Sequence, residues 1–357
     1  MEEDSLKLTR RQLLQCLGSG LVLGGAGDGS ALTAMIERVY EEVPTGRVDM
    51  GHRLLGKTDM KLSPVGLGGL LAHYEGVRGH PPPDEKRRIY LRAAELGITL
   101  FDMGYGDEVH IPEELKGNRE DIHFSLKSGK GGGAPRVADL EGEVDKHLRN
   151  LNRDRIDILR LHHYVYVGNS RLAEKIAALK QAGKIRSVCL IRHYLQDQLV
   201  YAGRGSEPEA DVDLVIYNYV SRWQEPGIAQ AAQAGKGVLV MKALGGQQLS
   251  WEHKLQTDWT QVGEETVERL AVRNIKGEEL KLVHSFVAGP WHELAEPGER
   301  VPRTDTAVKW VLKNQNVSSV LVAVASVDEL EQVLGLGRPP TTAVRPATWG
   351  AVKALSK

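Results

Sequence analysis

The sequence predicts an α/β fold, a closed (β/α)8 TIM barrel of parallel strands. Short apolar segments alternate with amphipathic segments eight times along the chain, which is the pattern of repeated strand-helix units. Glycine closes several of the amphipathic segments, as it commonly closes helices. A doubly wound open sheet is the alternative, but it needs a Gly-x-Gly-x-x-Gly turn after the first strand, and residues 66–74, GLGGLLAHY, lack that spacing.

The eight units follow one another along the chain. Strands are expected at residues 63–69, 98–104, 122–128, 156–163, 185–191, 212–218, 237–244 and 317–325. Amphipathic helices are expected at residues 84–97, 111–117, 137–152, 171–183, 195–203, 227–235 and 327–335, and a long insertion follows the seventh strand. Gly97, Gly183 and Gly235 close three of these helices. The barrel is expected to span residues 51–340, with a C-terminal tail at 341–357.

Length and composition limit the possible functions. A chain of 357 residues that is 41% hydrophobic can form one large domain without disulfide bonds. The formal net charge is −1 and the basic residues do not form one block, so we expect no nucleic-acid partner. Cys16 and Cys189 are too few for a thiolate metal cluster or a disulfide framework. We therefore expect no metal, and any cofactor should be organic.

The N-terminal region differs from the rest of the chain. Arg10 and Arg11 precede an apolar, glycine-rich run of roughly 15 residues, shorter than the ~20 that a membrane span needs. Residues 1–36 resemble a twin-arginine export signal, followed by a polar linker at 37–50. The protein is then expected to meet the export machinery as a folded chain and to be periplasmic or tethered by an uncleaved signal. The alternative is an amphipathic N-terminal helix on a cytoplasmic protein.

Ionisable side chains follow three consecutive predicted strands. Asp102 and Tyr105 end the second strand, Lys127 ends the third, and His162 and His163 end the fourth. In a barrel of this kind the carboxyl ends of the strands carry the catalytic residues. Each residue taken alone also has a structural interpretation, such as a turn cap, a rim aromatic or a solvated charge. Their shared position favours a site, and we expect His163 to be structural.

Several segments together give a specific resemblance. They are RLLGKTDMKLSPVGLGG, AAELGITLFDMGYGDE, LNRDRIDILRLHH, QAGKIRSVCLI and TAVKWVLKNQNVSSVLVA. Over residues 51–336 the chain resembles the aldo-keto reductase family. The resemblance implies nicotinamide-dependent hydride transfer to or from a carbonyl or alcohol. It also implies a catalytic tetrad of Asp102, Tyr105, Lys127 and His162.

The residue types of this implied tetrad suit the reaction. Hydride delivery to a carbonyl carbon leaves charge on the oxygen, so a proton donor such as Tyr105 must lie within hydrogen-bond reach. A nearby ammonium, that of Lys127, lowers the pKa of a phenol. Asp102 is expected to keep Lys127 charged and oriented, and His162 to align the substrate oxygen.

The sequence departs from the family pattern where the cofactor binds. Asp102 and Tyr105 are three positions apart, where the family has five. The cofactor-binding positions that the resemblance implies are Ile191, Arg192, Leu214, Met241, Lys242, Leu244, Gly245 and Ser326. Met241 replaces an aromatic residue that stacks on the nicotinamide, and a thioether can still pack on a ring.

The adenosine end of the implied site lacks the usual cations. Glu329 stands near the position of a family arginine, and a carboxylate repels a 2′-phosphate. We therefore expect NADH rather than NADPH among the NAD(P)H cofactors. Because an exported enzyme meets no soluble pool of reduced nicotinamide, we also expect the cofactor to be tightly bound.

An enlarged segment at residues 246–303 follows the seventh strand, at the active face of the predicted barrel. It contains the aromatic and histidine residues Trp251, Trp259, His284, Trp291 and His292. These side chains are expected either to cover a bulky substrate or to form a small core of the loop itself.

Two further functions remain open besides the oxidoreductase. One is a barrel of the same ancestry that has lost its cofactor site and binds a carbohydrate or a protein partner. The other is metal-dependent hydrolysis by Asp102, His162 and His163, which is weak because adjacent residues of a strand point to opposite faces.

Overall fold

The structure is a computed structural model that describes residues 50–68, 81–104, 106–129, 135–219, 221–245, 291–297 and 302–336. The chain divides into two compact units, Met1–Thr45 and Gly46–Lys357, and all described residues belong to the second. The predicted signal region 1–36, the linker up to residue 49 and the tail 341–357 lie outside the described residues.

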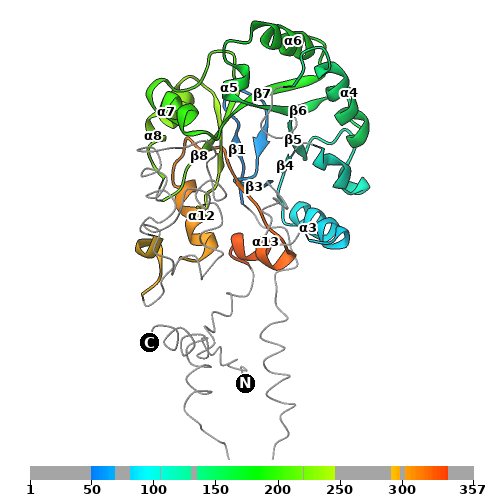
Figure 1. The fold of residues 1–357 in the computed structure, drawn as a ribbon. Helices are drawn as coiled ribbons and strands as arrows, with labels where there is room; N and C mark the ends of the chain where they lie inside the picture. The colour runs from blue at the N-terminus through cyan, green and yellow to red at the C-terminus, as the bar shows by residue number, and fades with distance from the viewer. Residues whose placement is uncertain are drawn as a thin grey trace, which may run out of the picture. The chain divides into compact units, whose positions relative to one another are not determined.

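Parallel strands close into a barrel in the order β10-β3-β4-β5-β6-β7-β8-β9, which confirms the predicted TIM barrel (Figure 1). The strands are β3 Val65–Gly68, β4 Leu100–Met103, β5 His123–Lys127, β6 Ile156–His162, β7 Ile185–Arg192, β8 Val212–Ile216, β9 Gly237–Met241 and β10 Ser319–Val322. A separate antiparallel pair, β1 Arg53–Leu54 and β2 Lys61–Leu62, precedes the barrel. Each barrel strand lies within a predicted apolar segment, except that β7 runs one residue further.

Helices surround the barrel in Figure 1. They are α3 Pro83–Glu95, α4 Leu140–Leu151, the single turn α5 His163–Tyr166, α6 Ser170–Gln181, α7 Leu195–Arg204, α8 Glu225–Gln233, α12 Thr304–Leu312 and α13 Val327–Val333. The glycines predicted to close helices at 97, 183 and 235 have φ of 91°, 73° and 78°, the left-handed region that favours glycine after a helix end.

The helix predicted at residues 111–117 is wrong. The structure has two short 3-10 helices there, η1 Asp107–His110 and η2 Glu113–Leu115. Ile111 precedes Pro112 and has ψ of 127°, the extended conformation that a following proline favours. The chain therefore cannot run through this point as one α-helix.

Two layers of apolar side chains form the core. The larger layer lies between the strands and the helices, and includes Phe101, Leu159 and Val240. The second fills the barrel and consists of the buried residues Leu55, Met60, Leu62, Leu100, Ile158, Cys189, Ile191, Val212, Leu214, Leu239 and Leu321. Since residues alternate along a strand, membership of this second cluster shows which residues face the barrel interior.

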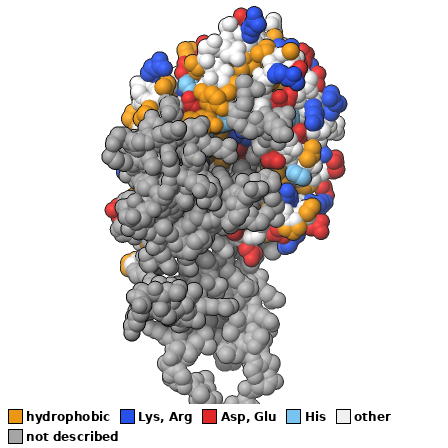
Figure 2. Space-filling model, viewed as in Figure 1, with side chains coloured by type: hydrophobic (Ala, Val, Ile, Leu, Met, Phe, Trp, Pro, Cys, Tyr) orange, Lys and Arg blue, Asp and Glu red, His pale blue; other side chains and the backbone are white. Residues whose placement is uncertain are grey.

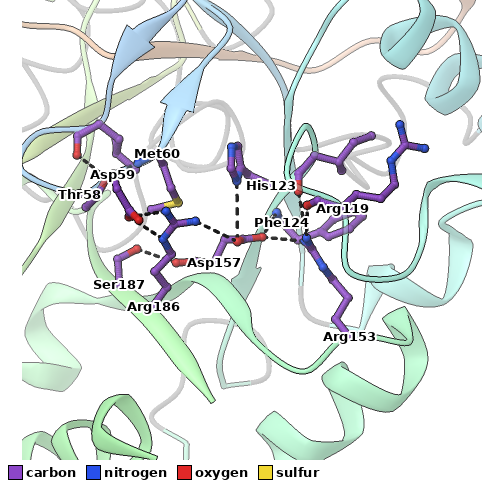
Figure 3. A network of polar contacts seen from close by, with 12 residues as sticks. Thr58, Asp59, Met60, Arg119, His123, Phe124, Arg153, Asp157, Arg186 and Ser187 are labelled. Carbon is purple, nitrogen blue, oxygen red and sulfur yellow. Dashed lines mark hydrogen bonds and ion pairs between the residues drawn. The ribbon is translucent and has the colours of Figure 1, made fainter. Parts of the chain in front are cut away.

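A polar network ties together the N-terminal ends of the strands (Figure 3). Asp157, the second residue of β6, accepts hydrogen bonds from Arg153 Nη1 at 2.7 Å and from the backbone amide of Phe124 at 2.9 Å. His123 Nδ1 lies 3.7 Å from the other carboxylate oxygen. Burial opposes ionisation, but His123 and Arg153 outweigh it and lower the pKa of Asp157. The network stabilises the face of the barrel opposite the expected site.

The surface of the described region carries both signs of charge. On the face shown in Figure 2, acidic and basic side chains are interspersed and apolar side chains lie between them. Within the described ranges, no helix is both long and apolar enough to cross a membrane.

Candidate active site

Three predicted tetrad residues lie at the carboxyl ends of adjacent strands. Asp102 is the third residue of β4, Lys127 the last of β5 and His162 the last of β6. Asp102 lies two residues after Leu100, and His162 lies four residues after Ile158. Leu100 and Ile158 belong to the interior cluster, and even spacing keeps residues on one face of a strand, so both side chains face the barrel interior at one end. Tyr105, the fourth predicted residue, lies outside the described residues.

Asp102 is buried and pairs with an arginine that the sequence analysis did not select. Arg160 Nε lies 2.7 Å from Asp102 Oδ1, with 7% and 6% of the two side chains exposed. Gly68 of β3 stands beside Asp102 in register, and a Cβ there would lie 3.0 Å from the Asp102 Cβ. A glycine at this position therefore leaves room for the carboxylate.

The charges around Asp102 differ in their effect on its protonation. Burial raises the pKa of Asp102, because a carboxylate loses its hydration inside the barrel. Among the groups that favour the ionised form, Arg160 has the largest effect and Lys127 the smallest. Lys127 is half-buried and stands beside Arg160 in register. The expected pairing of Asp102 with Lys127 is thus secondary to the pairing with Arg160.

His162 is a neutral imidazole at neutral pH. Its side chain is 8% exposed, and burial, followed by the charges of Lys127 and Arg160, lowers its pKa to about 4. Its ring lies in an aromatic group with Tyr164 at 5.4 Å, Tyr194 at 5.6 Å and His193 at 6.4 Å between centroids. Tyr164 is 46% exposed, so one ring of this group faces solvent. A ligand next to His162 can therefore meet an aromatic surface.

Two of the predicted cofactor residues have apolar side chains inside the barrel. Ile191 of β7 and Leu214 of β8 are 4% and 2% exposed and belong to the interior cluster. Their side chains can make van der Waals contacts with a cofactor but cannot form a hydrogen bond with the carboxamide group of a nicotinamide.

Arg192, which the resemblance implies as a cofactor-binding position, does not face the mouth of the barrel, and this corrects the expectation from the sequence. Its side chain is fully buried, its Nε donates to Asp213 Oδ1 at 3.0 Å, and its guanidinium lies 5.2 Å from the Tyr201 ring centroid. Because Ile191 faces the interior, its neighbour Arg192 faces helix α7.

His163 belongs to the same outer layer as Arg192. It pairs with Asp197 at 2.8 Å and with Glu207 at 2.9 Å. These contacts agree with the structural role expected for it.

The remaining predicted cofactor residues follow β9. Met241 packs against the interior cluster, and Lys242 comes next with φ of 59°. Burial lowers the pKa of Lys242 to about 8. Gly245 has φ of 65° and donates its amide to the Lys242 carbonyl at 2.9 Å. The Gly245 amide is therefore occupied within the turn, and the Lys242 ammonium is the group here that can attract an anionic diphosphate.

Carboxylates occupy the start of helix α13, beside Ser326, which the resemblance implies as a cofactor-binding position. Ser326 caps the helix, and its hydroxyl accepts from the Glu329 amide at 3.2 Å. The Val327 amide donates to Glu85 at 3.0 Å, and the Ala325 amide donates to Glu329 at 2.8 Å. These amides are therefore occupied, and the two carboxylates repel a phosphate. The residues do not fit a 2′-phosphate at this helix.

Part of the enlarged segment contacts the ends of β8 and β9. Leu294, in the 3-10 helix η5 Trp291–Leu294, packs against Ala307 of α12, as do Tyr219 and Leu244, which follow β8 and β9. Glu293 accepts a hydrogen bond from the Tyr219 hydroxyl. Trp251, Trp259 and His284 lie outside the described residues, and the structure describes only the backbone of Trp291 and His292.

The site can now be compared with known proteins. A model of the aldo/keto reductase family matches residues 64–344, well over half of the chain. The chain belongs to the aldo/keto reductase family. This membership assigns the general function of an oxidoreductase that uses a nicotinamide cofactor.

Curated relatives of this aldo-keto reductase act on small carbonyl or alcohol compounds, as their names state. L-glyceraldehyde 3-phosphate reductase of Escherichia coli O157:H7 is 26% identical over 326 residues, covering 79% of this chain and 86% of the relative. L-galactose dehydrogenase of Arabidopsis thaliana is 24% identical over 313 residues, covering 78% and 86%.

Solved structures show the same fold. An aldo-keto reductase from Bacillus halodurans in its apo form has a TM-score of 0.56 and 23% identity, covering 82% of this chain and 93% of that one. Its holo form has a TM-score of 0.55 and 22% identity over the same shares.

Two features near this site were missed from the sequence. Arg160 lies two residues before His162 on β6, and residues two apart on a strand face the same side, so the sequence could have placed Arg160 inside the barrel. Glu108, fully buried in η1, pairs with His147 of α4 at 2.8 Å. Nothing in the local sequence signals that second pairing, because the two residues lie far apart in the chain.

Proposed function

We propose that this aldo-keto reductase reduces a carbonyl or oxidises the corresponding alcohol at the barrel end formed by β4, β5 and β6. The observation that carries the proposal is the position of Asp102, Lys127 and His162 at the carboxyl ends of three consecutive strands. A bound nicotinamide supplies or accepts the hydride at the carbonyl carbon.

The chain's own residues handle the proton and the substrate oxygen. Tyr105 follows β4 by two positions and is proposed to give its proton to that oxygen, or to take one from it. The Lys127 ammonium favours the phenolate and so assists the exchange. With a pKa of about 4, His162 is neutral at pH 7 and keeps one N–H to align the oxygen.

NADH is the proposed cofactor. Met241 offers a thioether surface for the nicotinamide ring, and Lys242 supplies a cation for the diphosphate. The carboxylates of Glu85 and Glu329 at α13 disfavour the 2′-phosphate that distinguishes NADPH. Tight binding of the nucleotide is part of the proposal.

The proposed substrate is a small polyhydroxylated carbonyl compound or its alcohol. The relatives named for L-glyceraldehyde 3-phosphate and L-galactose support this class. The segment 246–303 is proposed to cover the substrate, since its described part reaches the ends of β8 and β9.

A second function has a specific observation in its favour. Ile191 and Leu214 are apolar and buried, and Arg192 is turned away from the mouth, so the usual polar contacts to a carboxamide are absent from these described positions. The alternative is a barrel that binds a carbohydrate or a protein partner without turnover.

Export through the twin-arginine pathway is also a proposal. It rests on Arg10, Arg11 and the weakly apolar residues that follow them. Fusing residues 1–50 to a reporter that must fold before export tests it. The reporter should reach the periplasm, and replacing both arginines with lysine should retain it in the cytoplasm. Equal localisation of the two fusions would contradict the export proposal.

Nucleotide binding separates the two functions. Under the oxidoreductase proposal, denaturing the purified protein releases a dinucleotide, or added NADH at about 1 mM raises the melting temperature. If no dinucleotide is released and neither NADH nor NADPH moves the melting temperature, the binding function replaces the oxidoreductase.

Tyr105→Phe then tests the chemistry. With DL-glyceraldehyde and NADH as probes, kcat should fall by roughly 100-fold or more while NADH binding is retained. Tyr166→Phe, which removes the hydroxyl of a tyrosine in α5, is the matched control. Equal turnover of Tyr105→Phe and the wild type would remove Tyr105 from its role.

A further inference from the structure

Arg160 is a buried cation inside the barrel, close to all three described tetrad residues. It lies between Ile158 and His162 along β6, so it faces the interior, and it is 6% exposed. It stands beside Lys127 of β5 in register. Arg160 is not a member of the predicted tetrad.

The side chain of Arg160 reaches across β5 to β4. Its Nε lies 2.7 Å from Asp102 Oδ1, and its Nη2 donates to the backbone carbonyl of Met103. A planar guanidinium can hold a carboxylate and a carbonyl at once in a fixed geometry, which an ammonium cannot. These two contacts fix both the side chain and the backbone at the end of β4.

The same guanidinium affects the charge of its neighbours. It favours the ionised form of Asp102 more than Lys127 does. It also disfavours the imidazolium of His162, together with burial and Lys127. Removing it would leave a buried carboxylate without its nearest cation, and such a loss is strongly destabilising for the ionised form.

We propose that Arg160 is a positioning residue of this active site, holding the Asp102 carboxylate and the Met103 carbonyl across the barrel. The proposal rests on the proposed oxidoreductase function. Arg160 thus takes the place beside the Asp102 carboxylate that the family resemblance gave to Lys127.

The test compares Arg160→Leu and Arg160→Lys with the wild type, using DL-glyceraldehyde and NADH. For Arg160→Leu we expect kcat/KM to fall by roughly 100-fold, since small displacements of reacting groups have effects of that size. Arg160→Lys should recover part of this loss. In Arg160→Leu the acidic limb of the pH profile should move to higher pH, because His162 loses a repelling cation and its pKa rises from about 4.

A readout without turnover accompanies the kinetics. The His162 ring is titrated by NMR, with its signal assigned from His162→Gln. In Arg160→Leu the His162 pKa should rise, and in Arg160→Lys it should stay near the wild-type value.

Arg192→Leu is the matched control, because it removes another buried arginine, which pairs with Asp213 on the outer face of the barrel. It should lower stability without changing the His162 titration.

The outcomes are distinguishable. If the wild type binds no nucleotide and turns over no substrate, the proposed function fails, and the positioning role fails with it. If the wild type is active and Arg160→Leu keeps its kcat/KM, pH profile and His162 titration, only the positioning role is overturned. If Arg160→Leu does not fold, Arg160→Lys decides: a wild-type kcat/KM would then overturn the inference, since an ammonium cannot hold the Asp102 carboxylate and the Met103 carbonyl in the same fixed geometry.

Discussion

The segment that follows β4 is anchored by a buried ion pair, and this pair should make the protein's stability depend on pH. Glu108 Oε1 lies 2.8 Å from His147 Nδ1, with 0% and 3% of the side chains exposed. Asn150 donates to the same carboxylate oxygen at 2.9 Å, and Glu143 lies 3.7 Å from the other ring nitrogen. Replacing His147 with glutamine removes the imidazolium and keeps a polar side chain.

The size of the effect follows from the histidine's pKa. Burial disfavours the imidazolium, but the contacts with Glu108 and Glu143 outweigh it and raise the pKa of His147 from 6.5 to about 9. At 1.36 kcal/mol per pKa unit, this corresponds to about 3 kcal/mol of stability. Because the folded pKa is the higher one, the contribution is complete below pH 6.5 and is lost as pH rises through about 9.

Urea unfolding of the wild type and His147→Gln between pH 6 and pH 10 measures this effect. The difference in free energy of unfolding between them should shrink by about 3 kcal/mol over that range. His110→Gln, at an exposed position of η1, is the control for the general effect of replacing a histidine with glutamine. A His147→Gln difference that changes by less than about 0.5 kcal/mol would refute the reasoning.

Three further predictions concern other parts of the barrel. Asp157→Asn should lower the free energy of unfolding, measured in urea, by about 3 kcal/mol, because it leaves Arg153 buried without its carboxylate partner. The kcat should not change. A loss of activity without a loss of stability would contradict this prediction. Tyr164→Ala should raise KM for L-galactose about fivefold and leave KM for DL-glyceraldehyde unchanged, because only the larger substrate can cover the exposed ring of Tyr164. Equal effects on the two KM values would argue against an aromatic subsite. Glu329→Arg should tighten NADPH binding about tenfold in a fluorescence titration and leave NADH binding the same, because it replaces a carboxylate by a cation that binds the 2′-phosphate. Unchanged NADPH affinity would place the 2′-phosphate elsewhere.

The barrel was predictable from the sequence because its units are local. Each strand is a short apolar run and each helix an amphipathic one, so the order of elements can be read along the chain. The helix expected at 111–117 failed because a proline competed with the amphipathic pattern, and this too is local.

The candidate site was predictable only in part. Asp102, Lys127 and His162 were selected because strand ends are readable in the sequence, and the structure brings these strand ends together. The orientation of Arg192 was missed, although alternation along β7 places it opposite Ile191. Its partner Asp213 comes from the next strand and depends on the register between β7 and β8.

The sequence by itself determined the number and order of the barrel strands and which ionisable residues end them. Only the tertiary structure decided which charges meet: Arg160 with Asp102 across an intervening strand, and Glu108 with His147 of helix α4. The physical reason is that secondary structure follows from neighbours along the chain, whereas an ion pair depends on strand register and barrel closure, which place distant residues within a few ångströms of each other.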